Sequence, residues 1–159
     1  MAALTQYQPL LQRVCRVYCP DPDDRQDLYQ EIVLHLWRAW PSYEARAGAK
    51  ISTWLYRIAL NVAISDLRQR TRKPPPSRFG DAVPEVVTPP EGGPDAEDLA
   101  QLYQAIERLS DVEKAFVLLY LEERTYEEMA DILGITQNNV RVKMHRVQDK
   151  IRQLLTRPV

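Results

Sequence analysis

The fold of the C-terminal half of this 159-residue chain is decided by the stretch Thr125-Tyr-Glu-Glu-Met-Ala-Asp-Ile-Leu-Gly-Ile-Thr-Gln-Asn-Asn-Val-Arg-Val-Lys-Met-His-Arg146. The pattern predicts a short helix, a turn at Gly134 and a second helix capped by Thr136. Glycine accepts the positive φ of a helix C-cap, and threonine is a good N-cap. Ala130 supplies the small side chain that two closely crossing helices need. The stretch is therefore typical of a helix-turn-helix.

The second helix of this motif has two chemically different sides. One side is an apolar stripe of Val140, Met144, Val147 and Ile151. The opposite side carries Asn138, Val142, His145, Arg146 and Asp149, with Asn139 and Arg141 on its shoulders. Asparagine can pair with adenine and arginine with guanine in the major groove, so this side has the chemistry of a reader of duplex DNA. The alternative is an amphipathic core helix with a solvated charged face.

Helices are predicted throughout the rest of the chain. The C-terminal half should also hold helices at about 96–109 and 111–122, since Ser110 to Glu113 and Thr125 to Glu128 fit the capping box. In the N-terminal half we expect a helix over 4–19, one that starts at Asp21-Pro22 and is stopped by Pro41, and one capped by Ser52 that runs past Leu67. No alternating strand pattern occurs. The predicted fold class is all-α.

A Pro- and Gly-rich segment divides the chain. Residues 74–96 contain seven prolines and three glycines, too many for a helix or a central strand. We therefore predict two small helical domains, 1–73 and 97–159, joined by an acidic Pro-rich linker over 74–96.

The positive charge lies in two separate places. The net charge is −1, but residues 50–73 carry six basic side chains and one acid, and residues 137–159 repeat that count. Two stretches of +5 in a nearly neutral protein suggest two contacts with a polyanion. The first stretch starts with aromatic side chains, Trp54 and Tyr56, which can stack on unpaired bases but are more often core residues.

Several classes of function are disfavoured. No apolar run approaches the ~20 residues of a membrane span, and the N-terminus has no signal-peptide pattern. Cys15 and Cys19 are interpreted as small buried residues of a reduced, cytoplasmic protein. They form no metal-ligand pattern with His35, and no phosphate-binding loop or nucleophile elbow occurs. We expect neither an enzyme nor a bound metal, cofactor or small-molecule substrate.

Three motifs in this order resemble the extracytoplasmic-function class of bacterial sigma factors, which keep only the second and fourth sigma regions. They are Asp27-Leu-Tyr-Gln-Glu31 with Leu36-Trp37, then Ser52-Thr-Trp-Leu-Tyr-Arg-Ile-Ala-Leu-Asn61, then Leu109 through Arg146. The resemblance implies a protein that binds core RNA polymerase, recognises the −10 and −35 promoter elements and assists promoter melting. It implies contacts with the clamp helices and flap region of polymerase, with promoter DNA and with an anti-sigma factor, and no direct membrane insertion.

The resemblance also implies roles for individual residues. Asp27, Gln30 and Glu31 would contact core polymerase. The −10 element would be bound by Tyr56, Arg57, Asn61, Arg68, Arg70, Arg72 and Lys73, with the loop 43–51 helping to capture a flipped base. The −35 element would be read by Asn138, Asn139, Arg141, Val142, Lys143, His145 and Arg146. The loop has its own sequence here, so the preferred −10 base is not inherited from the family.

An operator-binding regulator with a helix-turn-helix is the main alternative. It accounts for residues 110–156 but leaves the basic helix at 52–73 and the polar edge at Asp27 to Glu31 unexplained. A regulator of that kind also tends to dimerise on two half-sites, and the chain has no heptad seam for dimerisation.

Overall fold

The computed structural model describes residues 5–44, 50–72 and 95–156, and every regular element in these ranges is helical. The all-α prediction is therefore confirmed. The first unit consists of α2 (Gln8–Tyr18), α3 (Pro22–Glu44) and α4 (Ile51–Arg72). The second unit consists of α5 (Asp95–Glu107), α6 (Asp111–Leu121), α7 (Tyr126–Leu133) and α8 (Gln137–Thr156). Nearly all of the predicted linker over 74–96 lies outside the described residues.

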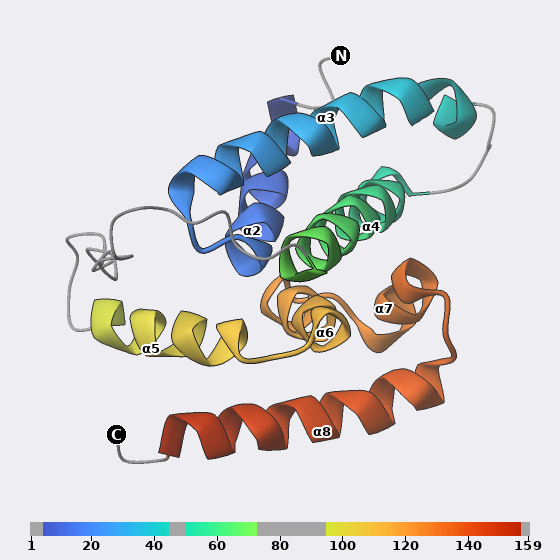
Figure 1. The fold of residues 1–159 in the computed structure, drawn as a ribbon. Coiled ribbons are helices and arrows are strands. Elements are labelled where there is room, and N and C mark those ends of the chain that lie inside the picture. Colours follow the sequence, from blue (N-terminus) through green and yellow to red (C-terminus); the bar gives the residue numbers. More distant parts are fainter. Residues whose placement is uncertain (1–4, 45–49, 73–94, 157–159) are drawn as a thin grey trace.

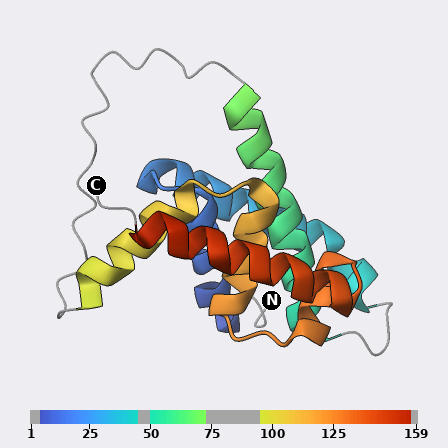
Figure 2. The same cartoon turned by 90° about the horizontal axis from the view of Figure 1, so that it is seen from below.

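The two units pack directly against each other. In Figure 1, α3 lies at the top, α8 lies at the bottom, and α6 sits between α4 and α8. Within the first unit α2, α3 and α4 all pack together, and across the interface α6 contacts α2 and α4 while α7 contacts α4. Figure 2 shows α8 lying along the outer side of the second unit. The patterns in the sequence did not predict this contact.

One apolar core runs through both units. It includes Leu11 and Ile32 in the first unit and Ile106, Leu119 and Met129 in the second, all of them fully buried. Burial of such side chains stabilises each by about 1.5–3 kcal/mol relative to exposure. The core therefore fixes how α4, the basic helix, sits against the helix-turn-helix.

α3 continues through Pro41 to Glu44, so the prediction that Pro41 ends this helix is wrong. A proline inside a helix removes one backbone donor, but an aromatic cluster holds the last turn in place. The ring centroids of Trp40 and Tyr43 lie 5.4 Å apart, and Trp54 of α4 lies 5.8 Å from Trp40 and 5.0 Å from Tyr43. Packing of this kind stabilises beyond simple burial.

The start of α3 follows its local sequence, whereas α2 begins at Gln8, without a side-chain cap, rather than near residue 4. The backbone N–H of Asp23 donates to the side chain of Asp21 over 2.9 Å, which confirms the predicted start of α3. α4 begins at Ile51, so Ser52 lies inside the first turn and the prediction that it is the N-cap is wrong. The N–H of Trp54 donates to the carbonyl of Lys50, so Lys50 occupies the N-cap position, two residues before Ser52.

Candidate nucleic-acid interface

The helix-turn-helix has the local geometry that its sequence predicts. The side chains of Ser110 and Thr125 accept hydrogen bonds from the N–H groups of Glu113 and Glu128, and both glutamates return a bond, so both capping boxes are formed. Gly134 follows α7 with φ of +70°, and its N–H donates to the carbonyl of Ala130 over 2.8 Å. These bonds fix the angle at which α8 leaves the turn.

The predicted cap of α8 and its apolar stripe are also present. The hydroxyl of Thr136 accepts from the N–H of Asn139 at 3.1 Å, which satisfies a free amide of the first turn. Val140, Met144 and Val147 are buried against the rest of the second unit. This stripe holds α8 in place and leaves its other side in contact with solvent.

The residues predicted to read DNA on α8 are all exposed: Asn138, Asn139, Arg141, Val142, Lys143, His145 and Arg146. Asn138, Val142, His145 and Arg146 lie on the side opposite the buried stripe, given 100° of rotation per residue, and Asn139 and Arg141 lie on its shoulders. Lys143 lies on the flank, where its ammonium group is 6.0 Å from the centre of the Phe116 ring. An exposed apolar Val142 among amides and guanidinium groups suits contact with a thymine methyl group.

The basic helix α4 differs from α8, because three of its predicted DNA-binding residues contact the second unit. Tyr56 is buried, and its hydroxyl donates to Glu122 Oε2 at 3.0 Å. Burial and the neighbouring Glu122 carboxylate raise the pKa of Tyr56. The guanidinium of Arg57 donates to the backbone carbonyl of Asp131 at the end of α7, over 2.9 Å from Nε.

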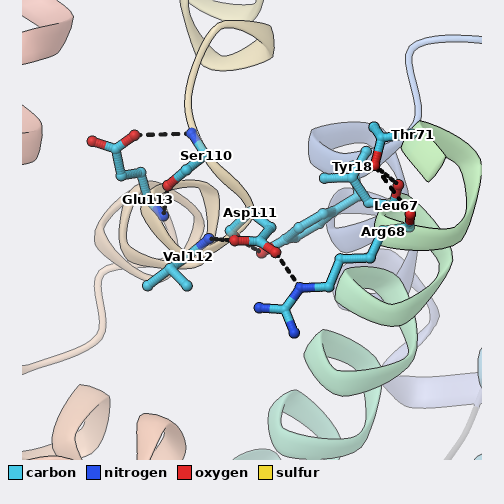
Figure 3. Close-up of polar contacts among 8 residues, drawn as sticks. All are labelled: Tyr18, Leu67, Arg68, Thr71, Ser110, Asp111, Val112 and Glu113. Atoms are coloured by element: carbon cyan, nitrogen blue, oxygen red, sulfur yellow. Dashed lines mark hydrogen bonds and ion pairs between the residues drawn. The ribbon is translucent and has the colours of Figure 1, made fainter.

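Arg68 makes the third of these contacts. Its Nε donates to Asp111 Oδ2 over 2.5 Å, and the hydroxyl of Tyr18 donates to the backbone carbonyl of the same aspartate over 2.8 Å. Figure 3 shows Arg68 directed from α4 toward Asp111 at the start of α6. Asp111 is therefore tied to two helices of the first unit.

The remaining predicted −10 residues lie in different surroundings. Arg70 pairs with Asp66 at 2.8 Å and also donates to the carbonyl of Tyr18, so it helps to hold α4 against α2. Asn61 and Arg72 are exposed. Lys73 and residues 45–49 of the predicted capture loop lie outside the described residues.

A cleft of about 200 Å³ brings the two sets of residues together. Its polar rim includes Arg57 and Asn61 of α4 and Lys143 of α8. Its apolar wall is made by Leu60, Ile64, Val112, Ala115, Phe116, Ile132, Leu133 and Ile135. One apolar cleft with a basic rim therefore joins both predicted DNA-binding helices.

The outer side of α3 forms a separate surface. Asp27, Gln30 and Glu31 are exposed there, while Leu28 and Ile32 on the other side of the helix are buried. Two large apolar side chains continue the exposed side, Leu34 at 47% and Trp37 at 61%. The motif Leu36-Trp37 predicts no role for Leu34, but the spacing of positions 27, 30, 31, 34 and 37 places both Leu34 and Trp37 on one side of the helix.

Burial makes the two cysteines unreactive. Both are free and fully buried, as the sequence predicts, and burial raises the pKa of Cys15 to about 12 and of Cys19 to about 11. The thiolate forms are therefore scarce at neutral pH. Within residues 5–44, 50–72 and 95–156, no group of three His, Cys, Asp or Glu side chains is arranged to hold a metal ion. None of the helices described there has the length and apolar character to span a bilayer.

Each unit matches the model of a known protein family. Residues 3–73 match the family model of Sigma-70 region 2, and residues 99–150 match that of Sigma-70, region 4. A chain that combines these two regions is a sigma factor of the sigma-70 family.

Similar proteins narrow this class. The ECF RNA polymerase sigma-E factor of Escherichia coli is 31% identical over 160 residues, which cover 93% of this chain and 82% of that protein. The RNA polymerase sigma-H factor of Pseudomonas aeruginosa is 30% identical over 146 residues, or 85% of this chain and 75% of that one. The chain belongs to the extracytoplasmic-function (ECF) sigma factors, which direct promoter recognition by RNA polymerase and are not enzymes.

Solved structures share the fold. The sigma factor RpoE in complex with the anti-sigma factor NepR from Bartonella quintana aligns with a TM-score of 0.71 at 20% identity, over 97% of this chain and 94% of that one. CnrH in complex with the cytosolic domain of CnrY aligns with a TM-score of 0.69 at 18% identity, over 97% and 85%. The arrangement of the helices is therefore shared with these two proteins of distant sequence.

Proposed function

We propose that this ECF sigma factor carries core RNA polymerase to promoters by two DNA-binding surfaces and one polymerase-binding surface. The exposed amide- and arginine-rich side of α8 carries this assignment, because it lies opposite a fully buried stripe in a correctly capped helix-turn-helix. A helix of this kind enters the major groove with its N-terminal residues toward the bases.

On α8, base contacts and phosphate contacts fall to different residues. Asn138, Arg141, His145 and Arg146 project from the exposed side and contact base edges of the −35 element. Val142 supplies an apolar contact among them. Asn139 and Lys143 on the shoulders contact the sugar-phosphate backbone, which positions the helix without reading sequence.

The −10 element is bound along α4. Arg57, Arg68 and Arg72 lie on one side of α4 with the exposed Asn61 and neutralise phosphates. Arg70 and Lys73 add positive charge to the end of this sequence. Extrusion of a base costs a few kcal/mol. The segment before α4 and the Tyr56 ring would offset that cost by holding the base, with no need for a nucleotide cofactor.

Core polymerase docks on the outer side of α3 through Asp27, Gln30 and Glu31. The exposed Leu34 and Trp37 extend this surface with apolar area, and tryptophan is enriched among interface residues that carry binding energy. The flap region of polymerase contacts the second unit. We place the protein in the cytoplasm, where polymerase and promoter DNA are found.

An anti-sigma factor regulates the protein in this proposal. Of the two solved structures reported above, one is described as a sigma factor in complex with the anti-sigma factor NepR and the other as CnrH in complex with the cytosolic domain of CnrY. Their fold is shared over 97% of this chain, so a comparable regulator would meet similarly arranged helices.

The direct test is to mix the purified protein with core bacterial RNA polymerase and a library of genomic promoter fragments. We expect co-elution with core polymerase and initiation at defined start sites that share two sequence elements. Absence of association, together with tight sequence-specific binding of the protein alone to duplex DNA, would identify an operator-binding regulator instead.

A further inference from the structure

The cleft bordered by α4, α6, α7 and α8 combines an apolar wall with a positively charged rim. Val112 in its wall is 41% exposed, so the cleft opens to solvent, whereas Leu60 and Phe116 of the same wall are buried. The cations of the rim are Arg57 and Lys143, and no acidic residue of the described chain lines the cleft. Binding sites for small molecules are typically apolar, with a few polar groups that orient the ligand.

The polar groups of the rim have unoccupied donors. Arg57 donates from Nε and Nη2 to the backbone carbonyl of Asp131, which leaves its Nη1 group. The ammonium group of Lys143 lies 6.0 Å from the centre of the Phe116 ring. Neither cation pairs with a carboxylate in the part of the chain that the structure describes. Asn61 adds an exposed side-chain amide to the same rim. The rim therefore offers three groups that can donate to an anion.

The volume of the cleft limits the size of its occupant. The cleft holds about 200 Å³. An apolar cavity of roughly 150 Å³ lined by leucine, isoleucine and phenylalanine binds benzene. The apolar part of a ligand for this cleft should therefore be slightly larger than benzene, such as a short alkyl chain or one substituted ring.

Two other clefts have a different balance of charge. One of about 360 Å³ is bordered by Arg13 and Arg124 but also by Glu122 and Glu123. In that cleft Arg13 of α2 donates from Nη2 to the carboxylate of Glu122 over 2.7 Å, so its charges are neutralised within the protein. Another, of about 240 Å³, is bordered by an arginine of α8 that pairs with an aspartate of the same helix. Of these three clefts, only the one between α4 and α8 has unpaired cations beside its apolar wall.

We propose that this cleft binds a small amphipathic anion, a carboxylate that carries a short alkyl chain or a single ring. The carboxylate lies at the rim and accepts hydrogen bonds from Arg57, Asn61 and Lys143. The chain lies between α4 and α6, in contact with Val112 and Phe116. The site does not depend on the proposed function, which assigns the same rim residues to DNA.

Isothermal titration calorimetry of the full-length protein with three probes of equal chain length tests this inference. The probes are sodium octanoate, octanamide and octylammonium chloride, each below the concentration at which it forms micelles. Because their chains are equal, differences in affinity report the charge preference of the rim. We expect octanoate to bind at one site, about tenfold more tightly than octylammonium, because two partly exposed ion pairs replace two repulsions. The affinity for octanamide should lie between these two.

Two variants, each with a matched control, locate the site. Val112→Trp fills the cleft from an exposed position and should abolish octanoate binding, whereas Leu99→Trp, at a position of α5 that is 39% exposed, should leave it unchanged. Lys143→Glu should weaken octanoate binding by about fivefold, since one attraction becomes a repulsion. Arg141→Glu, at an exposed position of the same helix outside the cleft, should have a much smaller effect. Circular dichroism of each variant confirms that its helices are intact.

Three results would overturn the inference. The first is the absence of saturable octanoate binding, or equal affinity for octanoate and octylammonium, since the rim would then not select an anion. The second is octanoate binding that survives both Val112→Trp and Lys143→Glu, which would place the site elsewhere. The third is a wild-type dimer in analytical ultracentrifugation that Val112→Trp abolishes, because a second copy of the chain would then cover the cleft.

Discussion

Arg57 of α4 and Lys143 of α8 border the same cleft, although each belongs to a different proposed DNA-binding surface. Two turns of duplex DNA span roughly 70 Å. Helices that share one cleft cannot contact elements so far apart at the same time. The two units must therefore separate when the protein binds a promoter together with polymerase, and the contacts described above are the ones that break.

Replacement of Arg146 by alanine removes a guanidinium from the exposed side of α8. We expect holoenzyme binding to promoters with a strong −35 element to weaken by about 1–3 kcal/mol, because one base contact is lost. Quantitative footprinting of such a promoter measures the change. The control is Arg152→Ala, at an exposed arginine near the end of the same helix. An equal loss in both variants would argue for a general charge effect rather than base reading.

Replacement of both Asp27 and Glu31 by lysine reverses the charge of the polymerase-binding surface on α3. We expect this variant to lose co-elution with core polymerase while it keeps its thermal unfolding midpoint, since both side chains are exposed. The matched control reverses two exposed acids of α5, Glu97 and Asp98. Holoenzyme assembly at the wild-type level by the α3 variant would refute the docking assignment.

Replacement of Gly134 by alanine tests the turn of the helix-turn-helix. A Cβ there would meet nothing within 4 Å, so the whole cost comes from the φ of +70°. We expect a loss of about 1–2 kcal/mol in the free energy of unfolding, measured by urea denaturation. Asparagine, which tolerates this conformation, should restore part of the loss. If alanine and asparagine cost the same, the left-handed conformation is not the cause.

The buried cysteines predict a specific dependence of stability on pH. In the folded protein the pKa of Cys15 is about 12 and that of Cys19 about 11. In the unfolded chain both thiols have the ordinary pKa of about 8.5. The unfolded state alone therefore releases these protons above that pH. Stability due to the protonated thiols is fully present below pH 8.5 and is lost as the pH rises toward 11–12, by up to about 1.4 kcal/mol per thiol per pH unit.

Urea titrations between pH 7 and 10 on wild type and on the double variant Cys15→Ala, Cys19→Ala measure this dependence. We expect the variant to lose less stability over this interval, even though the removal of two sulfurs lowers its stability at every pH. Alkylation at pH 8 should modify the wild-type thiols only at the rate of unfolding. Rapid alkylation of the native protein would contradict the burial of both side chains.

Local patterns predicted much of the fold. Each capping box, at Ser110 and at Thr125, and the left-handed turn at Gly134 involve residues only a few positions apart. The local sequence is therefore enough to locate α6, α7 and α8. Pro41 was misassigned because the contact that keeps its helix intact comes from Trp54 on the next helix. A contact of that kind leaves no signal in the sequence near the proline.

The contact between the two units was beyond sequence reasoning for the same reason. Arg13 and Glu122 are 109 residues apart. In the sequence each is a charged residue of the kind normally found on a solvent-exposed surface. The sequence allows Tyr56 to be either a core residue or a base-stacking residue. Its burial against Glu122 makes it a core residue in this structure, and the proposed stacking role applies only after the units separate.

The central claim is that α8 reads the −35 element while α4 and the segment before it contact the −10 element. It is tested most directly by selection of initiating promoters from a randomised library with holoenzymes that contain wild type or Asn138→Ala, Arg146→Ala. We predict that wild type enriches two sequence elements and that the double variant loses or changes only the upstream one. Enrichment of the same upstream element by both holoenzymes would contradict the account.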